Sequence, residues 1–430
     1  MALPLDSRLG RYEARLTLML LGGLLLRIAV FLWIPTQPVS DFGGYFMRAK
    51  SLALVGRDEV RPGLRDSSHP PAYPILLAAV LRLAPSADDL LAAKSANAAL
   101  AIAAALLGAD LARRLWGDEA GLWTAALLSF FPRSILMADL IASENLFAPL
   151  FLLFLLLASR RWTGAPSFRL AVLTGASVGL LTLTRSVAYL LPVVWLAGFL
   201  GGAPERRRVV AELALLLAVE HAILLPYAIH NQQSIGRFTF FSTVGGEGLF
   251  VGNNPRATGD WYPWIEDLER LHPGVSARGA LAIDDAARQE AIRWIRANPV
   301  RAAALYVRKL RLILTDDAFV AGFTILGERV LPGFHLLKAH PRAVRLGLRA
   351  AGLLLALTGL GGFVILVRRA REGSAVDRTL AAGFAAAALY VPVVSAVIAV
   401  NGRYRWPSED VIMPLAGLWL SRKESKRGQS

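Results

Sequence analysis

Long apolar segments alternate with short polar turns along the chain, and this pattern predicts a helical membrane protein. A bilayer core about 30 Å thick is crossed by roughly 20 apolar helical residues. Segments of that kind lie at 16–34, 91–112, 120–136, 144–158, 168–184, 187–200, 209–229, 345–367, 379–400 and 409–420. We therefore expect an all-α integral membrane protein with about ten transmembrane helices.

Two long stretches, 35–90 and 230–344, are too polar to span a bilayer and are expected to form large outer loops. Residues 282–297 repeat apolar side chains at helical spacing. Residues 303–314 place basic side chains among leucines, which is typical of a helix lying on the membrane surface. The expected organisation is a transmembrane module at 1–229, an outer loop with interfacial helices at 230–344, and C-terminal transmembrane helices with a cytoplasmic tail at 345–430.

The composition excludes a soluble globular domain, since 55% of residues are hydrophobic and only 18% are charged. A net charge of +15 on a soluble protein would indicate nucleic acid. Here, however, basic residues gather in the short loops on one side of the spans, among them Arg113, Arg114, Arg160, Arg161 and Arg206 to Arg208. The positive-inside rule then places both ends in the cytoplasm. We expect a multi-pass protein of the inner (plasma) membrane that contacts lipids and no nucleic acid.

Charged groups inside a lipid bilayer cost at least about 2.5–3.5 kcal/mol each, so those within the spans need an explanation. Arg27, Glu220 and His221 are the clear cases. One interpretation is that Arg27 and Glu220 pair across helices and fix their packing. The other is that these side chains line a polar cavity.

Asp41 follows the first span directly and is flanked by glycines that let a ligand approach closely. A carboxylate there can act as a general base for an acceptor hydroxyl, although position alone favours an ordinary helix-capping role. Further along the same loop, three prolines stiffen a turn around His69 and Tyr73. This turn holds an imidazole and a phenol beside the next apolar segment.

Other polar residues are expected at the outer ends of later spans. Arg133, Asp139 and Glu144 surround the start of the fourth span, where Glu144 suits either a helix N-terminus or a site. Single cations follow at Arg185, Arg403 and Arg405. Each can snorkel to lipid headgroups, whereas together they suit one anionic phosphate. Asn253 and Asn254 precede aromatic residues that fit either a saccharide-facing surface or an interfacial belt.

Seven sequence features occur in an order that resembles a known family. They are Asp41 after the first span, HPPAYP at 69–74, ADLIASENLFAPL around Glu144, LTLTR ending at 185, LPYAIHN at 225–231, GEGLFVGNNPRATGDWYP at 246–263 and NGRYRWP at 401–407. The chain is similar to bacterial family-39-like glycosyltransferases that use polyprenyl-phosphate sugars, relatives of protein O-mannosyltransferases and lipid A aminoarabinose transferases. The resemblance implies the class C glycosyltransferase (GT-C) fold with an active site on the outer face.

The resemblance also implies roles for residues in these segments. Asp41 and Glu144 match the acidic positions of the family's catalytic site. The residues expected to bind the donor phosphate are Arg185, His230, Arg237, Arg403 and Arg405. The residues expected to line the substrate site are Tyr45, His69, Tyr73, Arg133, Asp139, Asn253, Asn254 and Tyr404. The chain departs from the family pattern at Phe42, where many relatives have Glu, and at His230, where many have Arg.

The implied activity is transfer of a sugar from a polyprenyl-phosphate-linked donor to a lipid, glycan or protein acceptor at the outer face, with inversion at the anomeric carbon. The sequence has no Gly-rich nucleotide loop, which agrees with a lipid-linked donor. A divalent metal stays an open alternative, although no close ligand spacing supports one, and no other cofactor is implied. The alternative from another class is a transporter or flippase for a lipid-linked or anionic substrate, with Arg27 and Glu220 as midplane charges.

Overall fold

The computed structural model describes residues 8–34, 36–56, 59–61, 64–65, 69–85, 88–202, 205–315, 319–326 and 335–427. Each of the ten predicted spans overlaps a helical segment. These segments are α1 (Arg8–Trp33), α4 (Asp89–Trp116), α5 (Asp118–Phe130) with α6 (Pro132–Ala138), α7 (Glu144–Thr163), α8 (Phe168–Thr184), η1–α9–η2 (Ser186–Leu190, Leu191–Ala197, Gly198–Gly201), α10 (Arg206–Ile235), α17 (Pro341–Arg371), α18 (Ala375–Ser395) and α19 (Trp406–Arg427).

Six of these helices are long and apolar enough to cross a membrane, and the bent pair α5–α6 makes a seventh if it is one span. The bend between α5 and α6 is 52°. It falls at Pro132, which has no backbone N–H to continue the helix. The remaining segments, α8, η1–α9–η2 and α19, stay predicted spans.

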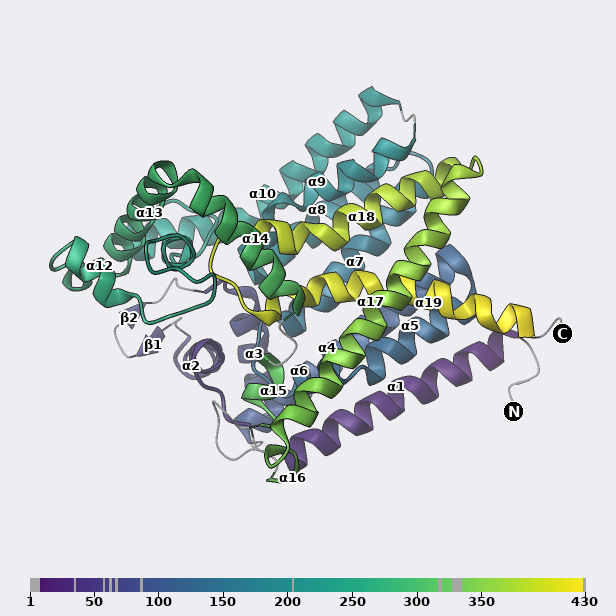
Figure 1. Ribbon diagram of the computed structural model, residues 1–430, viewed down its shortest axis with the longest axis horizontal. Helices are drawn as coiled ribbons and strands as arrows, with labels where there is room; N and C mark the ends of the chain where they lie inside the picture. The colour runs from purple at the N-terminus through teal and green to yellow at the C-terminus, as the bar shows by residue number, and fades with distance from the viewer. Residues whose placement is uncertain are drawn as a thin grey trace.

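The start of α1 and the end of α19 lie at one end of the helix bundle, and the loop elements gather at the other (Figure 1). The first loop forms α2 (Asp41–Val55), α3 (Ala72–Leu83) and an antiparallel pair of short strands that the sequence pattern did not predict, β1 (Glu59–Arg61) and β2 (Leu64–Arg65). The second forms α11 (Gly245–Gly252), α12 (Ile265–Leu271), η3 (Ser276–Arg278), α13 (Ala280–Ala297), α14 (Pro299–Thr315), α15 (Phe319–Phe323) and α16 (His335–Lys338). The short turn η4 (Gly402–Arg405) precedes α19.

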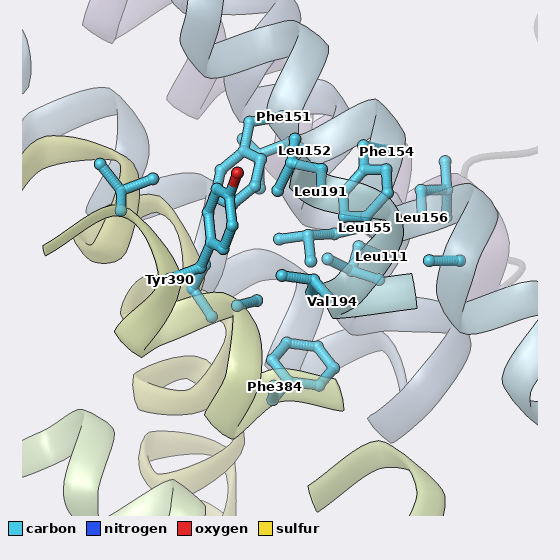
Figure 2. Packing of buried hydrophobic residues seen from close by; sticks show 14 of the residues in the cluster. Leu111, Phe151, Leu152, Phe154, Leu155, Leu156, Leu191, Val194, Phe384 and Tyr390 are labelled. Atoms are coloured by element: carbon cyan, nitrogen blue, oxygen red, sulfur yellow. The ribbon is translucent and has the colours of Figure 1, made fainter. Parts of the chain in front are cut away.

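The largest hydrophobic cluster lies in the middle of the bundle and centres on α7. Figure 2 shows Phe384 and Tyr390 of α18 pointing toward phenylalanines and leucines of α7, with Leu191 and Val194 of α9 beside them. The Tyr390 hydroxyl donates to the Val187 carbonyl over 2.6 Å, so this polar atom is satisfied inside the cluster. The core thus fixes α7, whose first turn carries Glu144, against α9 and α18.

The loop helices differ in how well the sequence predicted them. The amphipathic α13 is confirmed, with Ala287 and Ala291 fully buried. In α14 the expectation of basic side chains at the lipid surface is wrong for Lys309, which is 1% exposed. Its ammonium donates to the carbonyls of Gly252 and Val397 and to the Asn253 amide oxygen, at 3.2–3.3 Å. Lys309 therefore joins α14 to the end of α11 instead of facing headgroups.

Of the two interpretations of Arg27 and Glu220, the ion pair between them is wrong. The Arg27 guanidinium instead donates to backbone carbonyls of Gly23, Leu128 and Ser129 at 2.8–3.1 Å. Leu128 lies four residues before Pro132, whose ring nitrogen cannot donate to that carbonyl. The Arg27 guanidinium thus donates the hydrogen bond that Pro132 cannot donate. This satisfies a carbonyl that would find no water inside a bilayer. Glu220 is buried, and its carboxylate has no hydrogen-bond partner among the described residues.

Candidate active site

Asp41 is the first residue of α2, at the end of the bundle where the loop elements gather. The preceding Ser40 has a φ of 54°, which is uncommon for a residue other than glycine and turns the chain sharply into the helix. Ser40 makes no side-chain cap, and the Asp41 carboxylate accepts a hydrogen bond from the Arg403 guanidinium at 2.7 Å. Asp41 therefore contacts a cation from a distant part of the chain. Position alone favours a local helix-capping role for it instead.

Glu144 begins α7 and lies in the same cluster. Its carboxylate is 2.6 Å from the Arg185 guanidinium and 3.7 Å from Nε of Arg403. Ser143 makes no cap hydrogen bond to the helix, and its hydroxyl instead accepts hydrogen bonds from Tyr45 and Arg185 at 3.2 Å. The Ser143 hydroxyl therefore contacts side chains of the site instead of capping α7.

Arg403 connects the two carboxylates. Its Nη2 contacts Asp41 and its Nε faces Glu144, while its guanidinium also lies over the Tyr404 ring at 5.7 Å. Burial by itself would raise the pKa of Asp41, but Arg403, with smaller effects of His69 and Arg185, holds that pKa below its ordinary value. Asp41 is consequently ionised at neutral pH. Arg185 also lies over the Tyr404 ring, at 5.5 Å, so two guanidinium groups share one aromatic neighbour.

Aromatic residues predicted to line the site frame this cluster. The Tyr45 ring lies edge-on to His69 and to Tyr73, with centroids 4.7 and 5.6 Å apart. The Tyr73 hydroxyl donates to Asn97 at 2.7 Å, which fixes the start of α3 against α4. The HPPAYP turn thus places its imidazole against α2, beside Asp41.

Arg405 and Arg133 do not join the Asp41 cluster. The Arg405 guanidinium donates to Glu409 at 2.9 Å and to the Leu314 carbonyl, and Arg133 forms a second ion pair with Glu409. The direct phosphate-binding role predicted for Arg405 is therefore not supported, because this side chain is buried in a contact with α19. The sequence contained a signal for the contact between Arg405 and Glu409, because side chains four residues apart on a helix lie on one face.

Asp139 is also occupied elsewhere. Its carboxylate pairs with Lys94 of α4 at 2.6 Å and accepts a hydrogen bond from Thr36 at 2.5 Å. All three residues are buried. Asp139 therefore joins the end of α6 to α4 and to the segment after α1, so the prediction that it lines the substrate site is not supported.

The asparagines of the GNNP segment stabilise their own turn. Asn253 donates to the carbonyls of Leu249 and Val397 at 2.8 Å, and Asn254 donates to the Phe250 carbonyl at 2.7 Å. Both residues are buried. Their side chains therefore end α11 and do not form the predicted substrate-facing surface.

Two cations expected at the donor phosphate have local partners. Arg237 pairs with Asp285 of α13, and His230 lies exposed near the end of α10, with its ring 3.1 Å from the Ser234 hydroxyl. None of the described contacts joins either side chain to Asp41 or Glu144. The cations gathered in the cluster are Arg185 and Arg403.

Glu247 of α11 was not predicted as a site residue. Burial raises its pKa to about 7, and the negative charge of Asp41 adds to this effect. The neighbouring Gly248 carbonyl accepts a hydrogen bond from the Ala399 N–H at 2.9 Å, so α11 is joined to the segment that leads into Arg403. The sequence signal was an acidic residue between glycines in a segment already matched to the family.

We expect Glu247→Gln to change how stability depends on pH. The folded-state pKa of about 7 lies above the ordinary value of 4.5, so the stabilisation is complete below pH 4.5 and is lost as the pH rises through 7. Glutamine does not ionise. The variant should therefore lose less stability between pH 5 and pH 8, by on the order of 1–2 kcal/mol after allowance for partial exposure. Thermal unfolding in detergent at pH 5 and pH 8 measures this difference in stability. The control is Glu266→Gln, at an exposed position. Equal pH dependence in wild type and Glu247→Gln would contradict the prediction.

Among the described residues, no group of three His, Asp or Glu side chains could hold a metal ion. The two carboxylates of the cluster face guanidinium groups instead. This arrangement can orient a hydroxyl at Asp41 and bind one anionic phosphate through Arg185 and Arg403.

Comparison with known proteins identifies the fold that carries this cluster. Residues 68–230, less than half of the chain, match the model of a family described as dolichyl-phosphate-mannose-protein mannosyltransferase. The crystal structure of the Archaeoglobus fulgidus oligosaccharyltransferase in complex with Zn and sulfate superposes with a TM-score of 0.58, at 17% identity, over 96% of this chain and 49% of that one. The chain has the class C glycosyltransferase fold.

A second structure, archaeal oligosaccharyltransferase AglB from A. fulgidus with an inhibitory peptide and a dolichol-phosphate, gives a TM-score of 0.57, at 15% identity, over 97% of this chain and 50% of that one. The chain thus spans about half the length of these structures. ArnT from Cupriavidus metallidurans, bound to undecaprenyl phosphate, gives a TM-score of 0.47 at 15% identity over 97% of this chain and 79% of that one. No curated protein matches the chain. The predicted class C fold and the resemblance to this class are confirmed.

Proposed function

We propose that the protein is a membrane glycosyltransferase that moves a sugar from a polyprenyl-phosphate-linked donor to a lipid, glycan or protein acceptor at the outer face of the inner membrane. The observation that carries the proposal is the cluster of Asp41, Arg403, Glu144 and Arg185 at the loop end of a class C fold. Its two cations suit one phosphate, and the partly exposed carboxylate of Asp41 suits a hydroxyl acceptor. The dolichol-phosphate bound by AglB, which shares the fold, adds support.

In the proposed reaction, Asp41 accepts the proton of the acceptor hydroxyl as its oxygen attacks the anomeric carbon. The bond between that carbon and the phosphate oxygen breaks, and the electron pair leaves with the lipid phosphate. Attack opposite the phosphate inverts the configuration. Arg185 and Arg403 stabilise the charge that develops on the leaving phosphate, whose oxygen needs no proton. Glu144 holds both guanidinium groups in place.

The position of the buried charges argues against the transporter alternative. Arg27 is committed to the carbonyls at the α5–α6 bend, which leaves Glu220 without the midplane partner that the alternative required. The cluster of Asp41, Arg403, Glu144 and Arg185 lies at the loop end of the bundle. A site open to one face suits transfer at that face better than passage across the membrane.

The proposal is tested with purified full-length protein in liposomes. Labelled undecaprenyl-phosphate-mannose and undecaprenyl-phosphate-glucose are supplied with an extract of cell envelopes as the source of acceptors. We expect the label to move from the lipid donor to a new product. Vectorial uptake of label without a new product would favour the transporter and overturn the proposal.

The predicted sidedness can be measured directly because the chain contains no cysteine. We expect Arg278→Cys, in the exposed loop before α13, to react with a membrane-impermeant maleimide in intact cells. Glu372→Cys, in the exposed turn between α17 and α18, should react only after the inner membrane is permeabilised. The reverse pattern would place the candidate site in the cytoplasm. The wild-type protein, which cannot be labelled at a thiol, is the control.

A further inference from the structure

Two elements that carry carboxylates are joined to one short segment, the residues between α18 and α19. Arg403 in this segment donates to the Asp41 carboxylate of α2 at 2.7 Å. Earlier in the same segment, the Ala399 N–H donates to the Gly248 carbonyl of α11 at 2.9 Å. The residue before Gly248 is Glu247, and the negative charge of Asp41 acts on it. The fold therefore brings a second carboxyl group into the neighbourhood of Asp41.

The backbone beside Glu247 is fixed, so its side chain has a defined position. The Gly246 N–H donates to the Asp284 carboxylate at 2.6 Å. A Cβ at Gly246 would collide with the Asp284 carbonyl oxygen, so α11 packs directly on α13. The Trp264 side chain makes a hydrogen bond to the Glu247 carboxylate, and Glu247 stays partly exposed. A carboxylate offers about four acceptor positions, so positions remain for a ligand.

The charges around Glu247 are unbalanced. Both charged side chains that act on it, Asp41 and Asp284, are acidic, and no cation among the residues that the structure describes pairs with its carboxylate. The charge of Asp41 is offset by Arg403 at 2.7 Å, and that of Asp284 by Arg288 at 2.6 Å. Burial raises the pKa of Glu247 to about 7, and Asp41 adds to this effect. A bound cation would therefore stabilise the one carboxylate here that the protein leaves uncompensated.

We propose that Glu247 binds an ammonium group of the acceptor, which makes the acceptor a hydroxyl compound that also carries an amine. The inference rests on the proposed function, which assigns the acceptor hydroxyl to Asp41 and the donor phosphate to Arg185 and Arg403. The ammonium takes no part in the bond that forms. It orients the acceptor, and an acceptor without an amine is disfavoured because the Glu247 carboxylate then stays uncompensated.

The test changes the amines of the acceptor and leaves its hydroxyl groups in place. Full-length protein is placed in liposomes of phosphatidylcholine and phosphatidylglycerol, which contain no primary amine, with labelled undecaprenyl-phosphate-mannose and undecaprenyl-phosphate-glucose as donors. One cell-envelope extract is divided into three portions: untreated, N-acetylated, which removes the positive charge, and reductively dimethylated, which keeps it. The initial rate at limiting extract reports kcat/KM for the acceptor. We expect N-acetylation to lower it about tenfold to a hundredfold, the range for a hydrogen bond to a charged group, and dimethylation to change it only a few-fold.

Variants then assign the effect to Glu247. Glu247→Gln keeps the size of the side chain and loses its charge, so its rate with untreated extract should fall to that of wild type with acetylated extract. Acetylation should then lower the rate of this variant little further. Glu247→Asp keeps the charge and should retain part of the preference, and Glu266→Gln, at an exposed position of α12, is the matched control. Chloroform–methanol partition and protease digestion of the labelled product separate lipid, protein and glycan sources of the amine.

The possible outcomes separate this inference from the proposed function. A wild-type rate that N-acetylation leaves unchanged would overturn the inference. So would a loss on acetylation that is as large in Glu247→Gln as in wild type, because the amine would then be recognised elsewhere. Absence of transfer by wild type to all three portions of the extract would instead contradict the proposed function.

Discussion

Replacing Asp41 with asparagine is expected to lower the rate of sugar transfer by about 10²–10⁴-fold, the contribution of a positioned general base. Asparagine keeps the size of the side chain and can still accept a hydrogen bond from Arg403. It cannot take the proton of the attacking hydroxyl at neutral pH. The loss should therefore appear in kcat, with little change in the KM of the donor, because Arg185 and Arg403 remain to bind phosphate.

The measurement is initial rate against donor concentration for full-length protein in liposomes, with Asp89→Asn as the matched control. Asp89 is the first residue of α4 and pairs with Lys50 of α2 over 2.7 Å. It takes no part in the cluster. Below neutral pH the wild-type rate should persist to strongly acidic conditions, since the cations around Asp41 hold its pKa low. A kcat for Asp41→Asn within a few-fold of wild type would exclude a base at this position.

The parts of the site that were predictable are those whose position depends on the membrane. A span that crosses the bilayer must end at its surface, so polar residues directly after a span are confined to one plane. That constraint brought Asp41, Glu144, Arg185 and Arg403 into one region from hydropathy and motif order alone. Their convergence to 2.6–3.7 Å then depends on how the helix ends pack, which no pattern along the chain encodes.

Two of the predictions that failed concern polar residues whose partners are distant in sequence. Asp139 finds Lys94 across two helices, and Asn253 finds Lys309 across the second loop. In each case a buried charge or amide stabilises packing. Composition alone cannot distinguish such a structural residue from a residue of the site. Arg27 is the instructive case, because its role follows from Pro132. A missing backbone donor inside a membrane helix requires a substitute, and a lone arginine in the preceding span was the available one.

Replacing Arg403 with glutamine is expected to abolish transfer and to destabilise the fold at the same time. Arg403 faces Asp41 and Glu144, so its removal leaves two carboxylates close together, with only Arg185 to compensate them. Removing one partner of a largely buried ion pair costs about 3–5 kcal/mol. The donor should also bind about 10²-fold more weakly, since charge-assisted hydrogen bonds to phosphate are lost.

A double variant separates the two effects. Adding Glu144→Gln to Arg403→Gln removes one of the uncompensated charges, so thermal unfolding in detergent should recover toward wild type, while binding of undecaprenyl phosphate stays weak. Arg403→Lys should keep most of the stability but bind phosphate less well, because an ammonium cannot offer the planar pair of donors that a guanidinium presents. If the stable double variant bound undecaprenyl phosphate as tightly as wild type, Arg403 would be a structural cation only, and the phosphate site would have to lie elsewhere.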